Sequence, residues 1–120
     1  MSTTISLQNA FYRARDMEKA DRFYGGLLGA SLKFADGTRW RQYEIGGRKF
    51  ALASEEEAHP QMRGAALVFE TDDIEAGKAK ALALGGRILE TRDMGPHGVT
   101  IVVADPEGNI LHLWARASSR

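Results

Sequence analysis

Two stretches of this chain, residues 9–32 and 66–89, look like two copies of one unit, offset by 57 positions. The positions that keep their residue type are Asp16 and Asp73, Glu18 and Glu75, Gly29 and Gly86, and Leu32 and Leu89. Each copy runs from an apolar strand through an acidic helix start and an amphipathic helix to a glycine and a second strand. The repeat predicts two similar modules, with a ligand site between two facing sheets.

The composition is that of a soluble globular domain. Of 120 residues, 43% are hydrophobic and 27% are charged, and the length suffices for one domain with its own core. Sixteen basic residues balance sixteen acidic ones, so no net field favours nucleic acid or a membrane surface. The chain has no cysteine, which excludes disulfides, thiolate metal sites and a cysteine nucleophile. The first residues do not resemble a signal peptide, and we expect a cytoplasmic protein.

Two helices are predicted, and each begins after an aspartate that can cap its free amide groups. After Asp16, the residues expected to be buried are Met17, Ala20, Phe23, Tyr24, Leu27 and Leu28. After Asp73, they are Ile74, Gly77, Ala81 and Leu84. Glycines end both helices, at Gly29 and at Gly85-Gly86.

The remaining apolar stretches predict eight strands. Their expected ranges are 6–14, 31–35, 39–45, 49–54, 65–71, 87–91, 99–104 and 109–115. Each half is therefore a βαβββ module, which makes the fold class α+β. We expect a single domain, with module one at about residues 5–54, a solvated polar linker at 55–63 and module two at about 64–116. Turns are predicted at Gly46-Gly47 and at 105–108.

The order and spacing of these pieces resemble the glyoxalase, bleomycin-resistance and ring-cleaving dioxygenase superfamily, also called vicinal oxygen chelate proteins. The stretches that carry the resemblance are residues 15–29, 72–86 and the Ala-Asp-Pro-Glu-Gly-Asn segment at 104–109. The loop at 95–98, this segment and Leu113-Trp114 look most similar to a lactoylglutathione-lyase-related branch. The resemblance implies an open eight-stranded cup with two flanking helices, and in many members a homodimer. In its enzymes, His, Gln or Glu side chains hold a divalent metal that substrate oxygens chelate.

Carried over to this chain, the family's four metal-ligand positions are Asn9, Ala51, Ala66 and His112. Alanine has no lone pair to donate, and a neutral asparagine oxygen is a poor ligand for these metals. One imidazole falls short of the three protein ligands that a catalytic zinc-type site needs. We therefore expect no metal and no other cofactor. Two alternatives stay open, because Glu70 or a residue of a second subunit could complete a site.

Strand alternation predicts which side chains line the cup. The expected ligand-binding residues are Asn9, Phe11, Arg13, Trp40, Val68, Glu70, His112 and Trp114. Alternation does not fix the face of the strand that carries Trp40. Residues expected to pack on the helix side are Tyr12, Leu67, Phe69, Leu111 and Leu113. A mostly apolar lining with a few polar groups is typical of small-molecule pockets.

Three functional hypotheses follow. The first is a protein that binds a small apolar or aromatic molecule without metal, as a homodimer. The second is an enzyme, a lyase or isomerase related to glyoxalase, with His112 as the catalytic residue. The third, a protein-interaction domain, has no supporting pattern. His112 itself fits a proton-transfer group, a ligand-orienting group or a buried structural histidine. His97, flanked by glycines, fits a lid over the cup or an exposed turn.

Overall fold

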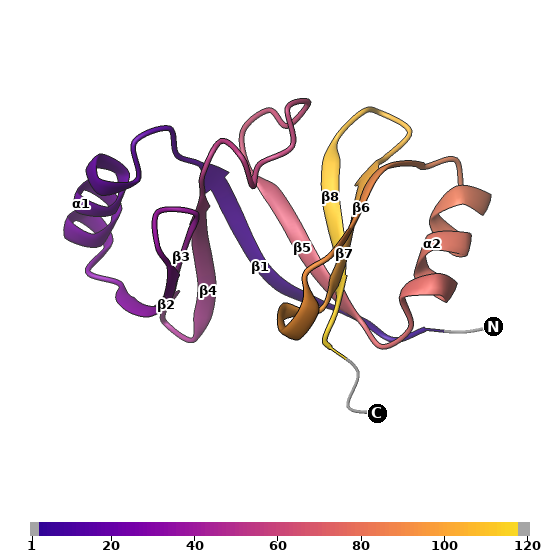
Figure 1. Ribbon diagram of the computed structural model, residues 1–120, viewed down its shortest axis with the longest axis horizontal. Helices are drawn as coiled ribbons and strands as arrows, with labels where there is room; N and C mark the ends of the chain where they lie inside the picture. The colour runs from indigo at the N-terminus through magenta and orange to yellow at the C-terminus, as the bar shows by residue number, and fades with distance from the viewer. Residues whose placement is uncertain (1–2, 118–120) are drawn as a thin grey trace. The chain divides into compact units, whose positions relative to one another are not determined.

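A computed structural model describes residues 3–117 and confirms the α+β class (Figure 1). In this range it has eight strands, two α-helices and one 3₁₀ turn. These are β1 (Ile5–Arg13), α1 (Met17–Leu28), β2 (Ser31–Asp36), β3 (Trp40–Ile45), β4 (Arg48–Ala53), β5 (Ala66–Thr71), α2 (Ile74–Ala83), β6 (Arg87–Asp93), η1 (Gly95–His97), β7 (Val99–Ala104) and β8 (Ile110–Ala115). Across this range, neither α-helix has the length and apolar character needed to span a membrane.

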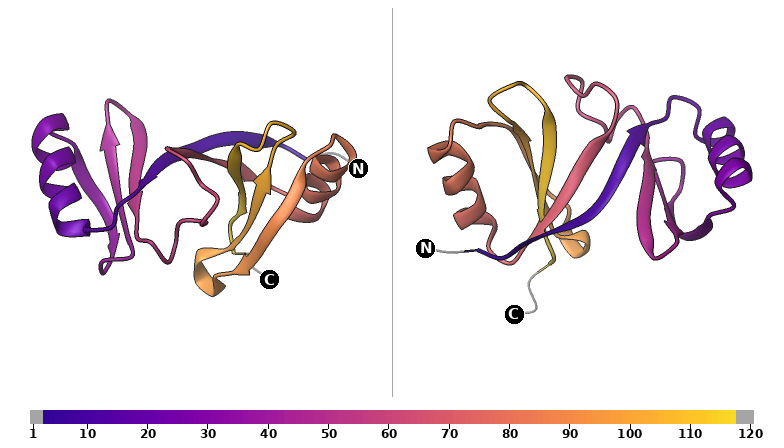
Figure 2. Two further views of the ribbon diagram at one scale, coloured as in Figure 1. Left: turned by 90° about the horizontal axis from the view of Figure 1, so that it is seen from above. Right: turned by 180° about the vertical axis from the view of Figure 1, so that it is seen from behind.

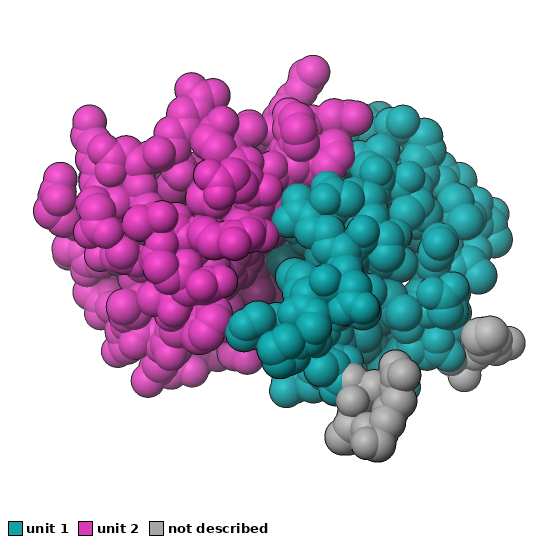
Figure 3. Space-filling model, viewed as in Figure 1, with its two compact units in different colours: residues 1–8, 67–120 teal, residues 9–66 magenta. Residues whose placement is uncertain are grey.

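The chain divides into two compact units, shown in teal and magenta in Figure 3. Unit 1 comprises residues 1–8 and 67–120, and unit 2 comprises residues 9–66. The division falls inside β1, after Gln8, so the first part of that strand belongs with the second half of the chain. Whether the chain is a single domain with the expected module limits stays a prediction.

Unit 2 is a four-stranded mixed sheet in the order β2-β3-β4-β1, with α1 on one face (Figure 1). Strands β1 and β4 are parallel with Phe11 opposite Ala51, and the other pairs are antiparallel. The core under α1 consists of Ala14, Met17, Tyr43 and Leu52. Tyr12 stacks on Tyr24 of the helix at 6.0 Å, as predicted. The opposite, helix-free face therefore carries the alternate β1 residues Asn9, Phe11 and Arg13.

Unit 1 repeats this plan in the order β5-β8-β7-β6, with α2 on one face (Figure 2). Strands β5 and β8 are parallel, with Val68 opposite His112. The core under α2 consists of Ile101, Val103 and Leu113, with Phe69 and Leu111 packed against it. Phe69, Leu111 and Leu113 thus pack on the helix side, as predicted. The helix-free face carries Val68, Glu70, His112 and Trp114.

The predicted N-caps of both helices, the glycine end of α1 and the two hairpin turns are confirmed, whereas α2 ends at Ala83 with Leu84 rather than a glycine as its cap. Asp16 accepts a hydrogen bond from the Lys19 amide at 3.1 Å, and Asp73 accepts one from the Ala76 amide at 3.0 Å. Gly29 ends α1 in the left-handed conformation, with φ of 60°. These local signals hold because they depend only on backbone groups within one turn of the capping residue.

Several residues expected to be buried are exposed. In α1, Phe23 is 57% and Leu27 is 67% exposed, and Leu28 is also exposed. Leu84 of the second stripe is 71% exposed and lies just after α2, and Leu67 of β5 is 43% exposed. Helical spacing shows which side chains share a face, but burial requires another element to cover that face.

The linker at 55–63 is not simply a solvated connection, which corrects a second expectation. Ala58 and Met62 are buried, with exposed fractions of 3% and 2%. The acidic run also makes ion pairs: Glu55 lies 3.2 Å from Arg15, and Glu57 lies 2.8 Å from Arg39. The segment is therefore a packed part of unit 2.

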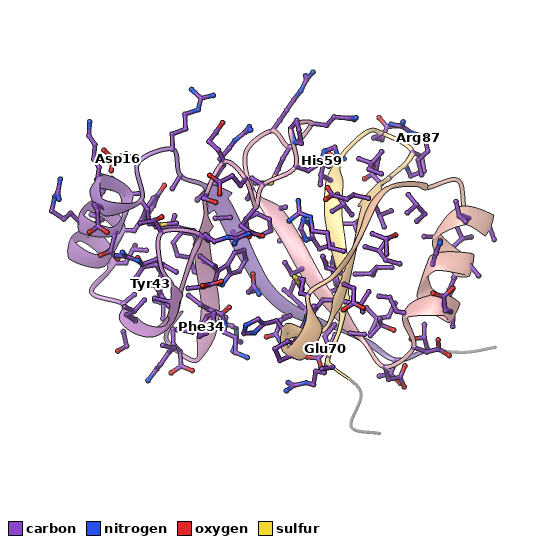
Figure 4. All side chains as sticks on the ribbon, in the orientation of Figure 1. Asp16, Phe34, Tyr43, His59, Glu70 and Arg87 are labelled. Carbon is purple, nitrogen blue, oxygen red and sulfur yellow. The ribbon has the colours of Figure 1, made fainter. Side chains whose placement is uncertain are left out.

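A polar network attaches α1 to β3. Arg41 forms ion pairs with Glu18 at 2.7 Å and with Asp21 at 2.9 Å. The hydroxyl of Tyr43, labelled in Figure 4, donates a hydrogen bond to Asp21. Burial raises the pKa of Tyr43, and the bond to Asp21 raises it further. The helix is thus held by a buried hydrogen bond as well as by apolar packing.

Candidate functional site

On the helix-free face of unit 2, two aromatic side chains lie together. The rings of Phe11 and Trp40 are 5.1 Å apart and tilted by 57°. The Trp40 indole N–H donates to Gln42 Oε1 at 3.3 Å. Trp40 therefore lies on the same sheet face as Phe11. The sequence alone did not determine which face Trp40 occupies. Phe11 is 1% exposed, so its contact with Trp40 is part of the packed interior of this face.

Asn9 lies two residues before Phe11 on the same face and is 7% exposed. Its side-chain oxygen is buried and accepts no hydrogen bond from the part of the chain that the structure describes. A buried acceptor of this kind favours a donor from a bound molecule or water.

Arg13, the third β1 residue on this face, is turned toward the linker. Its guanidinium donates to the Met62 carbonyl at 2.9 Å and lies 3.6 Å from Glu55. These contacts account for part of its hydrogen-bonding capacity and hold the linker against β1. The expected ligand-binding role of Arg13 stays a prediction.

On the helix-free face of unit 1, His112 lies between two apolar neighbours. Val68 of β5 and Val102 of β7 are its register partners on either side. All three are buried, with His112 7% and Val102 0% exposed. The imidazole is therefore buried between two apolar side chains, where one well-placed polar contact is worth more than in water.

That polar contact comes from Thr100 of β7. The Thr100 hydroxyl lies 3.3 Å from His112 Nδ1 and also donates to the Leu113 carbonyl at 3.3 Å. Thr100 is itself 4% exposed. Thr100 was not among the residues predicted from the sequence, although one signal was present: it is the single polar residue in the strand Val-Thr-Ile-Val-Val-Ala.

Trp114 follows His112 on the same face and is tied to the loop that contains η1. Its indole N–H donates to the His97 carbonyl at 2.8 Å. Gly98 lies close to the backbone of β8: a Cβ atom built on it would be 2.1 Å from the Ala115 carbonyl oxygen. The Gly-Pro-His-Gly loop therefore positions Trp114, and a lid role for His97 stays a prediction.

Glu70, labelled in Figure 4, is engaged by neighbours within unit 1. Its carboxylate accepts from Gln8 at 3.0 Å and pairs with Arg116 at 2.6 Å. The Arg116 guanidinium also lies over the Trp114 ring, 5.6 Å from its centre. Glu70 thus supports the Trp114 end of the face.

The same face carries a second ion pair, which was also not predicted from the sequence. Glu90 and Arg92 of β6 are in register with Val102 and Thr100, and their side chains are 2.5 Å apart. A register shift between Ile88 and Glu90 changes which residues of β6 face this way, and simple alternation does not reveal such a shift.

A separate apolar groove of about 300 Å³ lies on the helix-covered side of unit 1. The residues that line it include Ile5, Ala81, Leu84, Leu111 and Leu113, with Lys80 and Asp105 among them. It is on the opposite face of the sheet from His112, so it is not part of the predicted site.

One family model matches residues 6–113, which is most of the chain. The chain belongs to the Glyoxalase/Bleomycin resistance protein/Dioxygenase superfamily. The resemblance that the sequence motifs indicated is thereby confirmed. No curated protein matches the chain at a significant level.

Solved structures of this superfamily share the fold at low sequence identity. One is a superfamily member from Vibrio splendidus, at 16% identity, a TM-score of 0.68 and coverage of 93% of this chain and 99% of the other. Another is methylmalonyl-CoA epimerase from Mycobacterium tuberculosis, at 17% identity, a TM-score of 0.71 and coverage of 93% and 88%. An extradiol ring-cleaving dioxygenase from B. fuscum has 21% identity and a TM-score of 0.63, with coverage of 93% of this chain and 32% of the dioxygenase.

The superfamily's divalent metal does not fit the side chains at its four usual positions. Ala51 and Ala66 present methyl groups and are fully buried, at 0% exposure. Asn9 offers one neutral amide, and His112 has Thr100 at Nδ1. Among residues 3–117, no three His, Asp or Glu side chains are grouped as metal ligands. The four positions thus supply two donor side chains, Asn9 and His112, whereas a catalytic zinc-type centre requires three protein ligands.

Proposed function

We propose that this superfamily member binds a small, planar, mainly apolar molecule at the helix-free sheet faces, without a metal. The observation that carries the proposal is the chemistry of the four inherited positions, where two methyl groups and an amide accompany a single histidine. The helix-free face of unit 2 carries the packed aromatic pair Phe11 and Trp40, and the helix-free face of unit 1 carries the buried aliphatic Val68. Such a lining with few polar atoms suits sequestration of a flat molecule.

A ligand titration by NMR tests this proposal. We expect β-naphthol to shift signals of residues on the helix-free faces, such as Val68, Val102 and His112. At tenfold excess over Kd, binding to the native state adds about 1.4 kcal/mol and raises Tm by roughly 5 °C.

Leu84→Ser is a control for binding at the groove instead of the helix-free faces. Leu84 lines the groove on the helix-covered side and is already exposed. This variant should leave the affinity for β-naphthol unchanged. Shifts confined to Ala81, Leu84 and Leu111, or stabilisation by charged thiol conjugates alone, would contradict the proposed site.

A lyase or isomerase related to glyoxalase is the second candidate. Its supporting observation is the Thr100 contact, since a general base must be held in one orientation. Conversion of the methylglyoxal–glutathione adduct by the purified protein would favour it over sequestration. Glu70 is a weak partner for such chemistry because Arg116 and Gln8 already occupy its carboxylate.

A cytoplasmic homodimer completes the proposal. The exposed apolar side chains of α1, Phe23 and Leu27, lie four residues apart and so share one helix face, as an interface helix requires. We expect analytical ultracentrifugation to show a dimer, and Phe23→Glu with Leu27→Glu to shift it to monomer. The control is Leu84→Glu, an equally exposed site in unit 1. A monomeric wild-type protein at micromolar concentration would rule the dimer out.

A further inference from the structure

The apolar groove on the helix-covered side of unit 1 is lined by both buried and exposed side chains. Val103 and Leu113 belong to the core and are 3% and 6% exposed. Ile5 and Leu84 line the same groove, yet they are 44% and 71% exposed. Exposed apolar side chains around a hollow of about 300 Å³ leave surface for an apolar chain to cover.

Lys80 brings a positive charge to this groove from the last turn of α2. Residues three and four positions away along a helix are the neighbours that pair with a lysine. Here those positions hold only uncharged residues, Ala76, Gly77, Ala83 and Leu84. Among residues 3–117, the Lys80 ammonium makes no ion pair or hydrogen bond.

The other polar groups at the groove are already engaged. The last carbonyls of α2 accept hydrogen bonds from the backbone amides of residues 84–86. The Asp105 carboxylate accepts three hydrogen bonds within its own turn, from the Glu107 amide at 2.8 Å and from the backbone and side chain of Asn109 at 2.9 and 3.0 Å. Of the two charged residues that line the groove, Lys80 is therefore the one whose hydrogen-bonding capacity is unused within the described chain.

We propose that this groove binds a medium-chain alkyl carboxylate, with its carboxylate on Lys80 and its chain along Ile5 and Leu84. The carboxylate supplies the acceptor that the ammonium lacks. The alkyl chain has no polar atom to leave unpaired against the apolar lining. A volume at the lower end of small-molecule pockets favours one chain of medium length over a lipid with several chains. The site is separate from the helix-free faces of the proposed function.

An NMR titration with decanoate, below its micelle-forming concentration, tests the site. We expect saturable shifts at Ala81, Leu84 and Leu111. Signals of Val68 and His112, on the opposite face, should not move. Shifts centred on that opposite face, or no saturable binding at millimolar concentration, would overturn the proposal.

Two further probes test the ligand class. Octanoate should bind about fourfold more weakly than decanoate, because each of its two missing methylenes is worth about twofold when half-buried. Decyltrimethylammonium has the same chain length with a positive head group and should bind about threefold more weakly than decanoate. Equal affinities of decanoate and decyltrimethylammonium would contradict recognition of a carboxylate.

Lys80→Gln tests the head-group contact, and Lys78→Gln is its matched control. Lys78 lies on the same helix but does not line the groove, and neither lysine is buried. Lys80→Gln should weaken decanoate binding about threefold at low salt, and the difference from wild type should shrink as salt is added. Equal affinities in the two variants would contradict the role of Lys80.

Leu84→Ser tests whether a second copy of the chain covers the groove instead. We expect decanoate binding to weaken about threefold and the association state, measured by analytical ultracentrifugation, to stay unchanged. Weaker self-association with unchanged decanoate binding would assign the groove to a second copy and overturn the proposal. Measuring β-naphthol in parallel keeps failure of this site distinguishable from failure of the proposed function.

Discussion

Replacing Gly98 with alanine should lower the free energy of unfolding by about 3 kcal/mol. Gly98 has φ of 90° and ψ of −162°, a conformation that is essentially restricted to glycine. A Cβ there would lie 2.1 Å from the Ala115 carbonyl oxygen and 2.9 Å from the Trp114 indole nitrogen. The clash involves backbone, so the loop and β8 would have to separate. Urea unfolding followed by tryptophan fluorescence measures the loss.

Gly95→Ala is the control for this prediction. Gly95 also has a positive φ, of 60°, but a Cβ on it would meet nothing within 4 Å. Its expected cost is about 1–2 kcal/mol, from backbone conformation alone. Equal losses in the two variants would mean that the close approach of Gly98 to β8 is not a feature of the folded protein.

Stability should fall steeply at alkaline pH because of Tyr43. This side chain is 2% exposed, and burial followed by the hydrogen bond to Asp21 raises the pKa of its hydroxyl above the ordinary value of 10.0. Between that value and the raised one, the unfolded chain loses this proton while the folded protein keeps it. The unfolded state then binds fewer protons, so stability is fully present below pH 10 and declines above it. The expected slope is about 1.4 kcal/mol per pH unit from this group.

Tyr43→Phe isolates this contribution, since it removes the titrating group and keeps the ring. At neutral pH the variant should be less stable by about 2 kcal/mol, because a buried hydrogen bond to a carboxylate is lost. As the pH rises from 10 to 12, the two stability curves should converge. Curves that stay parallel over this range would show that Tyr43 does not hold its proton in the folded state.

Much of the fold could be predicted because its signals are local. Asp16, Asp73 and Gly29 act within one helical turn, and alternation placed His112 and Leu113 on opposite faces. Burial of α1 was predicted wrongly at Phe23 and Leu27, because periodicity does not say how much of a helix the sheet covers. The burial of Ala58 and Met62 was not predicted, because they are two isolated apolar residues in a segment that is otherwise polar and acidic.

The site was predicted less completely than the fold. Its strand faces follow from alternation, so Val68 and Trp114 fall with His112 as expected. Thr100 was missed because its role depends on the pairing of β7 with β8, which links positions 12 residues apart. The position of Glu90 and Arg92 on this face depends on a register shift in β6, and no local sequence pattern indicates such a shift.

Metal content and metal response together test the central claim most directly. Protein purified without chelators is analysed for bound metal, and its Tm is measured with added zinc, nickel, manganese and iron. We expect well under one ion per chain and no rise in Tm, because Ala51 and Ala66 have no donor atoms. A stoichiometric ion that raises Tm in the wild type, and is lost in His112→Ala, would contradict the account.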